Sequence, residues 1–326
     1  MPFLLLGVIT IVFVAARTTS ADPITSLVPE RLLGNQEVVA AARARWGLDK
    51  TAPEQYVIYV KNLVQGDLGT SFRTKQPVGS DLAERLPATM ELTIAALVIA
   101  ATIGIPAGVL AAVKRDTWVD HFVRLFSLIG SSLPVFWTGL ILLYILFVRF
   151  EITPGPGRID LRALPPDHIT GLYTVDSLLA GDFAQFSDAF RHLMLPAFVL
   201  GWAVMGIIAR MVRASMLDVL NQDYIRTARA KGLTNRQVIF THALRNALIP
   251  TITILGLSLA ALMTGAVLTE TVFSWPGLGS YAVEATRTLD MPAVMGVAIF
   301  GGAMFVVANL VIDVLYGFID PRIRVS

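Results

Sequence analysis

The feature that most constrains this chain is a set of long apolar runs. A helix needs about 20 mostly apolar residues to cross the hydrocarbon part of a bilayer. About six stretches approach that length: 2–16, 89–113, 122–148, 196–212, 247–269 and 292–318. Of the 326 residues, 55% are hydrophobic and 15% are charged, whereas a soluble domain carries about 25% charged residues. The sequence therefore predicts an all-α polytopic membrane protein with about six transmembrane helices.

The first apolar run, 2–16, is the weakest of the set. It is short, Arg17 follows it, and no basic residue precedes it. A secretory signal peptide would also begin with basic residues. We therefore favour a true first transmembrane helix at 1–19, with its cytoplasmic end missing, over a cleaved signal.

Basic residues gather on one side of the predicted membrane. Lys114 and Arg115 begin one short loop, the segment 213–247 carries many more, and two arginines lie at the end of the chain. Lys and Arg are enriched in cytoplasmic loops. We therefore expect a multi-pass protein of the cell (inner) membrane with both termini cytoplasmic. Residues 20–88 would be external, and 89–326 would form the transmembrane core with 213–247 as its cytoplasmic loop.

The external segment after the first helix shows signs of a small folded domain. Within 53–64, four apolar residues recur at helical spacing and predict a helix that packs on the membrane part. They are Tyr56, Val57, Val60 and Val64. The sequence GDLGTSF at 66–72 predicts a turn. A second long segment, 151–192, contains PGPG and a proline pair, which predict an irregular loop.

The chain lacks the motifs of several function classes. It has no G-x-x-x-x-G-K-[ST] sequence, so any ATP would have to be hydrolysed by a partner. It has no cysteine, and its four histidines are scattered, so we predict neither a metal site nor a cofactor on this chain. A net charge of +2 gives no indication of nucleic-acid binding. Ser258 has no histidine within an apolar run to activate it, so we do not expect an enzyme.

Few ionisable residues fall inside the apolar runs. Arg210 and Arg213 stand at the end of the fourth run, where long basic side chains usually extend to the membrane interface, and we assign them no function. Asp313 is better explained by interfacial hydration or by pairing with another subunit than by a proton relay. An ion-driven carrier usually needs a buried charged group. A secondary carrier or channel that works without ATP is therefore the less favoured alternative.

The segment 223–250 is basic and polar although it lies between two apolar runs. Its first part is rich in helix formers, and Gly232 is the residue type that ends a helix in the left-handed conformation. Thr234 and Gln237 have the spacing of a capping box that starts a second helix. The sequence therefore predicts two short helices joined by a fixed turn, followed by Pro250 at the entrance of the fifth span.

Five further segments carry a family resemblance. They are GDLGTSF (66–72), RLPATMELT (85–93), SLPVFWTGL (132–140), TETVFSWPGLG (269–279) and DPRIR (320–324). In this order, they resemble segments of the permease subunits of bacterial ABC importers for dipeptides, oligopeptides and nickel. Among these subunits the chain is most similar to the first of the two permeases.

The resemblance implies a fold, a function and a set of partners. The implied fold is that of a type I ABC importer permease, and the implied function is import of di- or oligopeptides by alternating access. Nickel or another small solute is the alternative cargo. The implied partners are a homologous second permease, two ATP-binding subunits that hold ATP and Mg²⁺, and an extracellular or periplasmic substrate-binding protein, all at the lipid bilayer.

By the same resemblance, 223–250 docks on the ATPase through a short coupling helix. Ala228, Gly232 and Pro250 match the general permease motif, whereas Arg226 stands where that motif has Glu. The 17 residues between Gly232 and Pro250 are typical of the longer peptide and nickel form. Tyr224, Ile225 and Ala228 would form an apolar face suited to a groove. The predicted coupling residues are Tyr224, Ile225, Arg226, Ala228, Arg229, Gly232, Thr234, Arg245 and Pro250.

A path through the membrane part would be lined by uncharged hydroxyl groups. The candidates are Ser131, Ser132, Thr138, Thr253 and Ser258. Hydroxyl side chains also mediate packing between membrane helices. The sequence leaves these two roles open at each position.

Overall fold

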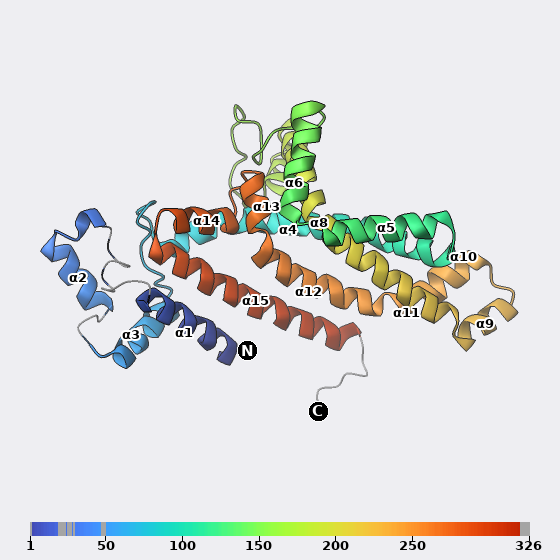
Figure 1. Cartoon of the computed structure of the whole chain (residues 1–326), viewed down its shortest axis with the longest axis horizontal. Coiled ribbons are helices and arrows are strands. Elements are labelled where there is room, and N and C mark those ends of the chain that lie inside the picture. Colours follow the sequence, from blue (N-terminus) through green and yellow to red (C-terminus); the bar gives the residue numbers. More distant parts are fainter. Residues whose placement is uncertain (1, 19–23, 25–27, 29, 47–49, 320–326) are drawn as a thin grey trace. The chain divides into compact units, whose positions relative to one another are not determined.

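The structure, a computed structural model, describes residues 2–18, 24, 28, 30–46 and 50–319. These residues form helices joined by loops (Figure 1), and within them the β-pairing amounts to one isolated bridge between Thr70 and Pro77. The chain divides into two compact units: Met1–Thr89 with Pro276–Val307, and Met90–Trp275 with Ala308–Ser326. The predicted division at 19 and 88 concerns the membrane boundary and stays a prediction.

The first unit is built around the N-terminal helix and the last long helix. Its elements are α1 (Pro2–Thr18), η2 (Glu30–Leu32), α2 (Gln36–Trp46), α3 (Ala52–Val64), the start of α4 (Val78–Val113), α14 (Leu278–Arg287) and much of α15 (Met291–Ile319). Phe13 of α1, Tyr59 of α3 and Ile299 of α15 are buried in one apolar cluster. This cluster holds α1 and α3 on α15.

Helix α3 confirms the predicted helix at 53–64, but the face that it buries is different. Its first turn is stabilised by a capping box between Thr51 and Glu54. Tyr56 and Val60 pack in the cluster as expected, whereas Val57 and Val64 are 65% and 83% exposed. The buried stripe includes Tyr59 and Leu63 instead, because residues three and four apart share one side of a helix. Val57 and Val64 therefore do not belong to the packed face.

The predicted turn at 66–72 is confirmed, and polar side chains tie it to the far end of the sequence. Ser71 donates to the Asp290 carboxylate at 2.5 Å, and the backbone N–H of Arg73 donates to the same carboxylate at 3.2 Å. Asp81, on α4, accepts from Thr74 and from the Tyr281 hydroxyl, each at 2.7 Å. Burial and this bond to a carboxylate raise the pKa of Tyr281, so the phenol stays protonated and keeps donating.

The second unit contains the remaining helices. They are the rest of α4, α5 (Trp118–Ser132), α6 (Val135–Leu143), η3 (Tyr144–Arg149), α7 (Tyr173–Leu179), α8 (Phe183–Leu220), α9 (Asp223–Ala230), α10 (Asn235–Gln237), η4 (Val238–Ala243), α11 (Leu244–Ala247), α12 (Ile249–Gly265), α13 (Val267–Val272) and the end of α15. The segments η3 and η4 are π-helical.

Helix α8 is packed on α4 and α5 by glycines at the contact points. A Cβ added at Gly201 would overlap with the backbone carbonyl of Ala96 on α4, and one added at Gly108 would overlap with that of Ala209. On the α5 side, a Cβ at Gly206 would overlap with the carbonyl of Ser127. Small residues permit such close backbone approach between membrane helices. These helices are therefore held at fixed positions around α8.

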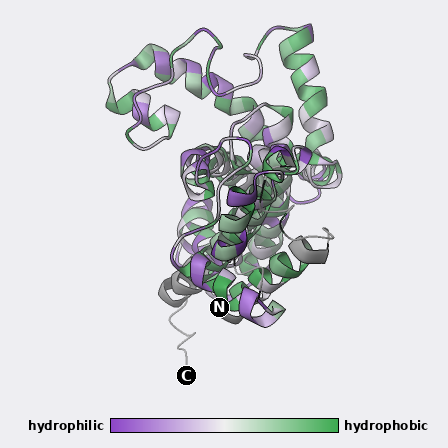
Figure 2. Ribbon diagram, turned by 90° about the vertical axis from the view of Figure 1, so that its left-hand side faces the viewer, coloured by the Kyte–Doolittle hydropathy of each residue, from purple (hydrophilic) through white to green (hydrophobic). Residues whose placement is uncertain are grey.

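The described helices match the six predicted spans in part. Three are long and apolar enough to cross a membrane: Val78–Val113, Phe183–Leu220 and Met291–Leu310. Two bent pairs raise this number to five if each pair is one span: Trp118–Ser132 with Val135–Arg149, and Asn235–Ala247 with Ile249–Met263. The first predicted run corresponds to the shorter apolar helix Leu5–Ala15. Hydrophobic residues cover much of the long helices (Figure 2).

Two predicted spans differ from the helices of the structure. The run 122–148 is two helices that meet at 104° across Leu133 and Pro134, since proline disfavours helical backbone at the residue before it. The helix that contains the fourth predicted span begins before Pro196, at Phe183. Asp182 caps the start of α8 by accepting from the backbone N–H of Gln185 at 2.9 Å. The second half of the predicted loop 151–192 is therefore largely helical.

Candidate functional site

Helix α9 forms the first half of the predicted coupling segment, and its apolar residues face inward. Ile225 is 0% exposed and Ala228 is 6% exposed, and α9 packs against η4, where Val238 is also fully buried. Of the predicted apolar face, Tyr224 remains available, with 41% of its surface exposed. The expectation that Ile225 and Ala228 present an open surface is therefore wrong: they hold α9 on its own chain.

The turn after α9 has the predicted geometry. Gly232 adopts φ +83°, in the left-handed region that favours glycine, and no heavy atom lies within 4 Å of the place where a Cβ would stand. The Thr234 hydroxyl and backbone N–H both contact the Gln237 side-chain oxygen, at 2.9 and 3.0 Å, and the Gln237 N–H donates back to Thr234 at 3.4 Å. This capping box confirms where the second helix starts.

The second half of the segment returns to α9 and then enters α12. Asn246, on α11, donates through Nδ2 to the Tyr224 hydroxyl at 2.8 Å. Ala243 and Ala247 are fully buried, which fixes η4 and α11 against the rest of the unit. Pro250 lies in the first turn of α12, where its missing N–H costs no helical bond. A short, packed connection therefore joins α9 to α12.

The charged residues of this segment lie at its surface. Arg226, Arg229 and Arg245 are all exposed. Arg226 forms an ion pair of 3.4 Å with Asp223, but both side chains are largely exposed, and such surface pairs contribute little. Phe240 of η4 is a large apolar residue with 56% exposure, which the sequence analysis did not single out. The exposed surface of the segment is therefore basic with two aromatic side chains, Tyr224 and Phe240.

The hydroxyl residues predicted for a membrane path have different environments. Ser131 and Ser132 are exposed at the end of α5, and Thr253 and Ser258 are half-buried on α12. Thr138 is buried on α6, and its hydroxyl donates to the carbonyl of Pro134 at 3.2 Å. Thr138 is therefore explained by local helix geometry.

Arg210 and Arg213 both contact α5, and their extension to the membrane interface stays a prediction. Arg213 donates to both carboxylate oxygens of Asp120, at 2.6 and 2.7 Å, and Asp120 is 0% exposed. This bidentate pair joins α8 to the start of α5. Arg210 donates instead to the carbonyl of Ser127 and to the hydroxyl of Ser131, each at 3.0 Å. Both arginines extend along α5, because α8 continues for two further turns beyond the end that the sequence predicted.

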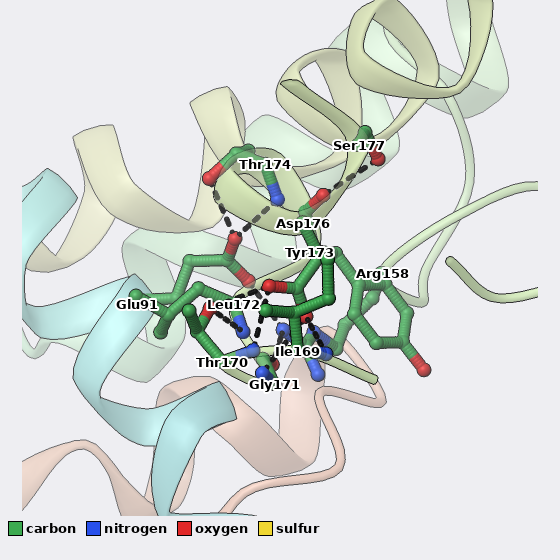
Figure 3. Close-up of polar contacts among 10 residues, drawn as sticks. All are labelled: Glu91, Arg158, Ile169, Thr170, Gly171, Leu172, Tyr173, Thr174, Asp176 and Ser177. Carbon is green, nitrogen blue, oxygen red and sulfur yellow. Dashed lines mark hydrogen bonds and ion pairs between the residues drawn. The ribbon is translucent and has the colours of Figure 1, made fainter. Parts of the chain in front are cut away.

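A second polar cluster, which the sequence analysis missed, connects α4 to the loop between η3 and α7 (Figure 3). Arg158 forms an ion pair with Glu91 at 2.5 Å, and the two side chains are 7% and 5% exposed. Glu91 also accepts from the backbone and hydroxyl of Thr174, at 2.8 and 2.7 Å. The guanidinium lies over the ring of Tyr173, 3.5 Å from its centroid. Removing one partner of such a buried pair costs about 3–5 kcal/mol.

Asp176 organises the backbone of the same loop. Its carboxylate accepts from the backbone N–H groups of Ile169, Thr170 and Gly171 at 3.4, 2.8 and 2.8 Å, and from the Thr170 hydroxyl at 2.6 Å. Burial acts to raise the pKa of Asp176, but these hydrogen bonds outweigh it and hold the pKa below its usual value. The loop is therefore an ordered element, whereas the sequence indicated only irregular structure. An acidic residue five positions after Gly171 was the signal available.

The comparisons with known proteins cover nearly the whole chain. The Escherichia coli K12 protein described as "Probable D,D-dipeptide transport system permease protein DdpB" is 46% identical over 97% of this chain and 93% of its own length. The Pseudomonas aeruginosa "Di/tripeptide transport system permease protein DppB" is 46% identical over 98% and 94%. The E. coli K12 "Dipeptide transport system permease protein DppB" is 42% identical over 98% and 94%.

A family model matches as well. A solved structure of the MetNI methionine ABC transporter overlaps with 70% of this chain and 93% of that chain at a TM-score of 0.48 and 17% identity, too distant to add to the assignment. The family model matches residues 104–325, which include both halves of the predicted coupling segment. On this match and on the identities above, the chain belongs to the family of inner membrane components of binding-protein-dependent transport systems.

Proposed function

We propose that this chain is the permease subunit that carries di- or oligopeptides across the cell membrane in an ATP-driven importer. The observation that supports this cargo best is the 42–46% identity, over 97–98% of the chain, to relatives described as dipeptide or di/tripeptide permeases. Identity of this extent covers both the membrane helices and the loops. Nickel is the alternative from the sequence, and no relative named above is described as a nickel permease.

The segment 223–250 is the proposed contact with the ATPase subunits. Its two short helices are joined by a fixed turn at Gly232 and are attached to α12 through Pro250. Tyr224, Arg226 and Arg229 offer an aromatic and basic surface on α9. Ile225, Ala228, Thr234 and Arg245 are proposed to support or extend that surface.

The proposed mechanism is alternating access. Two partner subunits bind ATP and Mg²⁺, and their closure would move the α9 segments of this chain and of a homologous second permease together. Because α9 is held on η4 by Ile225 and on α11 by Tyr224, its displacement would tilt α12. A substrate-binding protein would deliver the peptide at the opposite face, and both termini of this chain would be cytoplasmic.

Uptake in a deletion strain tests the proposed cargo. Cells that lack this gene, with and without a plasmid copy, are given labelled di- and tripeptides and, separately, labelled nickel. We expect peptide uptake to fall on deletion and to return with the plasmid, while nickel uptake stays unchanged. Loss of nickel uptake with intact peptide uptake would overturn the proposal, as would unaltered uptake of every peptide.

A further inference from the structure

Arg210, on α8, places a cation against the neighbouring helix α5. It lies ten residues before Leu220, the last residue of α8, which is about 15 Å along the helix axis. Its NH1 group donates to Ser127 and Ser131 on α5, each at 3.0 Å. Ser127 is itself nine residues after Trp118, where α5 begins. The guanidinium is therefore held along the seam of α5 and α8, well before α8 ends and close to the C-terminal end of α5.

The packing of the seam accounts for this position. Gly206 lies one turn before Arg210 on α8, and any Cβ there would overlap with the Ser127 carbonyl. Gly130 of α5 is covered by the Trp202 ring in the same way. The two helix backbones therefore touch directly beside Arg210, and its side chain must run along α5 to reach the acceptors.

Arg210 differs from its neighbour Arg213 in the charge that it faces. Arg213 is neutralised by the buried Asp120 through two bonds. Throughout the described part of the chain, no carboxylate pairs with Arg210, and its two acceptors are neutral oxygens. Arg210 is also exposed. A charged group beside apolar helices without a counter-charge indicates a functional role, and a guanidinium keeps further donors that match the two oxygens of a carboxylate.

We propose that Arg210, oriented by Ser127 and Ser131, binds the terminal carboxylate of the peptide during its passage through the membrane. The inference rests on the proposed peptide import, because every free peptide carries such a carboxylate. Ser131, which the sequence marked as a candidate for the path, then acts by holding the guanidinium in place. Arg210 supplies the positive counter-charge that a carboxylate needs in an apolar surrounding.

The test compares two cargos that differ in this one group. The complete transporter is reconstituted in liposomes with saturating binding protein, and initial uptake is measured for a dipeptide and for its C-terminal amide. We expect Arg210→Gln to lower uptake of the free dipeptide by roughly tenfold or more, the scale of a charge-assisted bond, and uptake of the amide by about twofold at most. Arg210→Lys should lie between these results. Arg124→Gln, which removes an exposed arginine of α5, is the matched control and should leave the ratio of the two rates unchanged.

Three results would contradict either this proposal or the proposed function on which it rests. Equal losses for both cargos in Arg210→Gln would show that the arginine serves packing or a lipid headgroup, and an unchanged rate for the free dipeptide would show that it does not contact cargo. Import of neither peptide by the wild-type transporter would instead reject the proposed function itself. Stimulation of ATP hydrolysis by the loaded binding protein, measured in parallel, confirms that each variant is assembled.

Discussion

Substitution of Gly232 by valine isolates the contribution of the turn between α9 and α10. At φ +83° with open space around the missing Cβ, valine would meet no neighbour, so its cost comes from the backbone alone. A left-handed conformation costs an L-residue about 1–2 kcal/mol, which disfavours the native turn by roughly 5- to 30-fold. The exposed position predicts that membrane insertion and assembly stay normal.

The assay is the ratio of peptide imported to ATP hydrolysed by the reconstituted transporter. We expect Gly232→Val to lower this ratio to about a fifth or less, because α9 loses its fixed direction relative to α10. Gly232→Asn should keep the ratio within about twofold, since asparagine tolerates the left-handed region.

Gly66 provides a control for backbone strain elsewhere in the chain. It has φ +80° and equally open surroundings, at the end of α3. Gly66→Val therefore introduces the same strain outside the proposed coupling segment and should leave the ratio unchanged. A normal ratio in Gly232→Val, or an equal loss in Gly66→Val, would refute the reasoning.

Three further substitutions test individual contacts. Thr234→Ala removes the capping box at a cost of about 1 kcal/mol, and amide hydrogen exchange over 235–243 should become about fivefold faster; unchanged exchange would contradict the cap. Asp120→Ala leaves Arg213 without its partner and should destabilise the folded chain by about 3–5 kcal/mol in thermal unfolding, whereas replacing both by leucine and methionine should recover much of this loss. The lowered pKa of Asp176 contributes stability above its usual value of 3.8 that is lost as the pH falls further. Protease protection of its loop should thus decline below about pH 4, and Asp176→Asn should remove that dependence.

The apolar runs predicted the long helices, because a helix that crosses the lipid needs a continuous apolar sequence. The same signal cannot locate the ends of a helix that leaves the apolar layer. The sequence placed the start of the fourth apolar run at Pro196, whereas the helix that contains this run already starts after its cap at Asp182. Within 122–148 the run is unbroken in hydropathy, and only the proline effect on backbone geometry reveals the bend at Leu133.

In the coupling segment, too, roles that depend on local sequence could be predicted, whereas roles that depend on tertiary packing could not. Gly232 and Thr234 act through local backbone chemistry, so their roles could be predicted from spacing. Burial of Ile225 depends on η4, which packs against α9 only after the chain has turned back, and no pattern within α9 indicates it. Likewise Arg158 meets Glu91 across 67 positions of sequence, and such pairs follow from tertiary folding.

Cross-linking of α9 tests most directly the claim that the segment 223–250 contacts the ATPase subunits. The sequence contains no cysteine, so an introduced cysteine is the only thiol on this chain. Thr227 on α9 and Thr286 on α14 are both exposed threonines whose hydroxyls bond to the carbonyl four residues earlier. The assembled transporter is treated with a thiol-to-amine reagent whose spacer contains a disulfide. We expect Thr227→Cys to cross-link to the ATPase subunit and to stop peptide uptake until the spacer is reduced, whereas Thr286→Cys should not cross-link to it. Cross-linking from Thr286→Cys but not from Thr227→Cys would contradict the account.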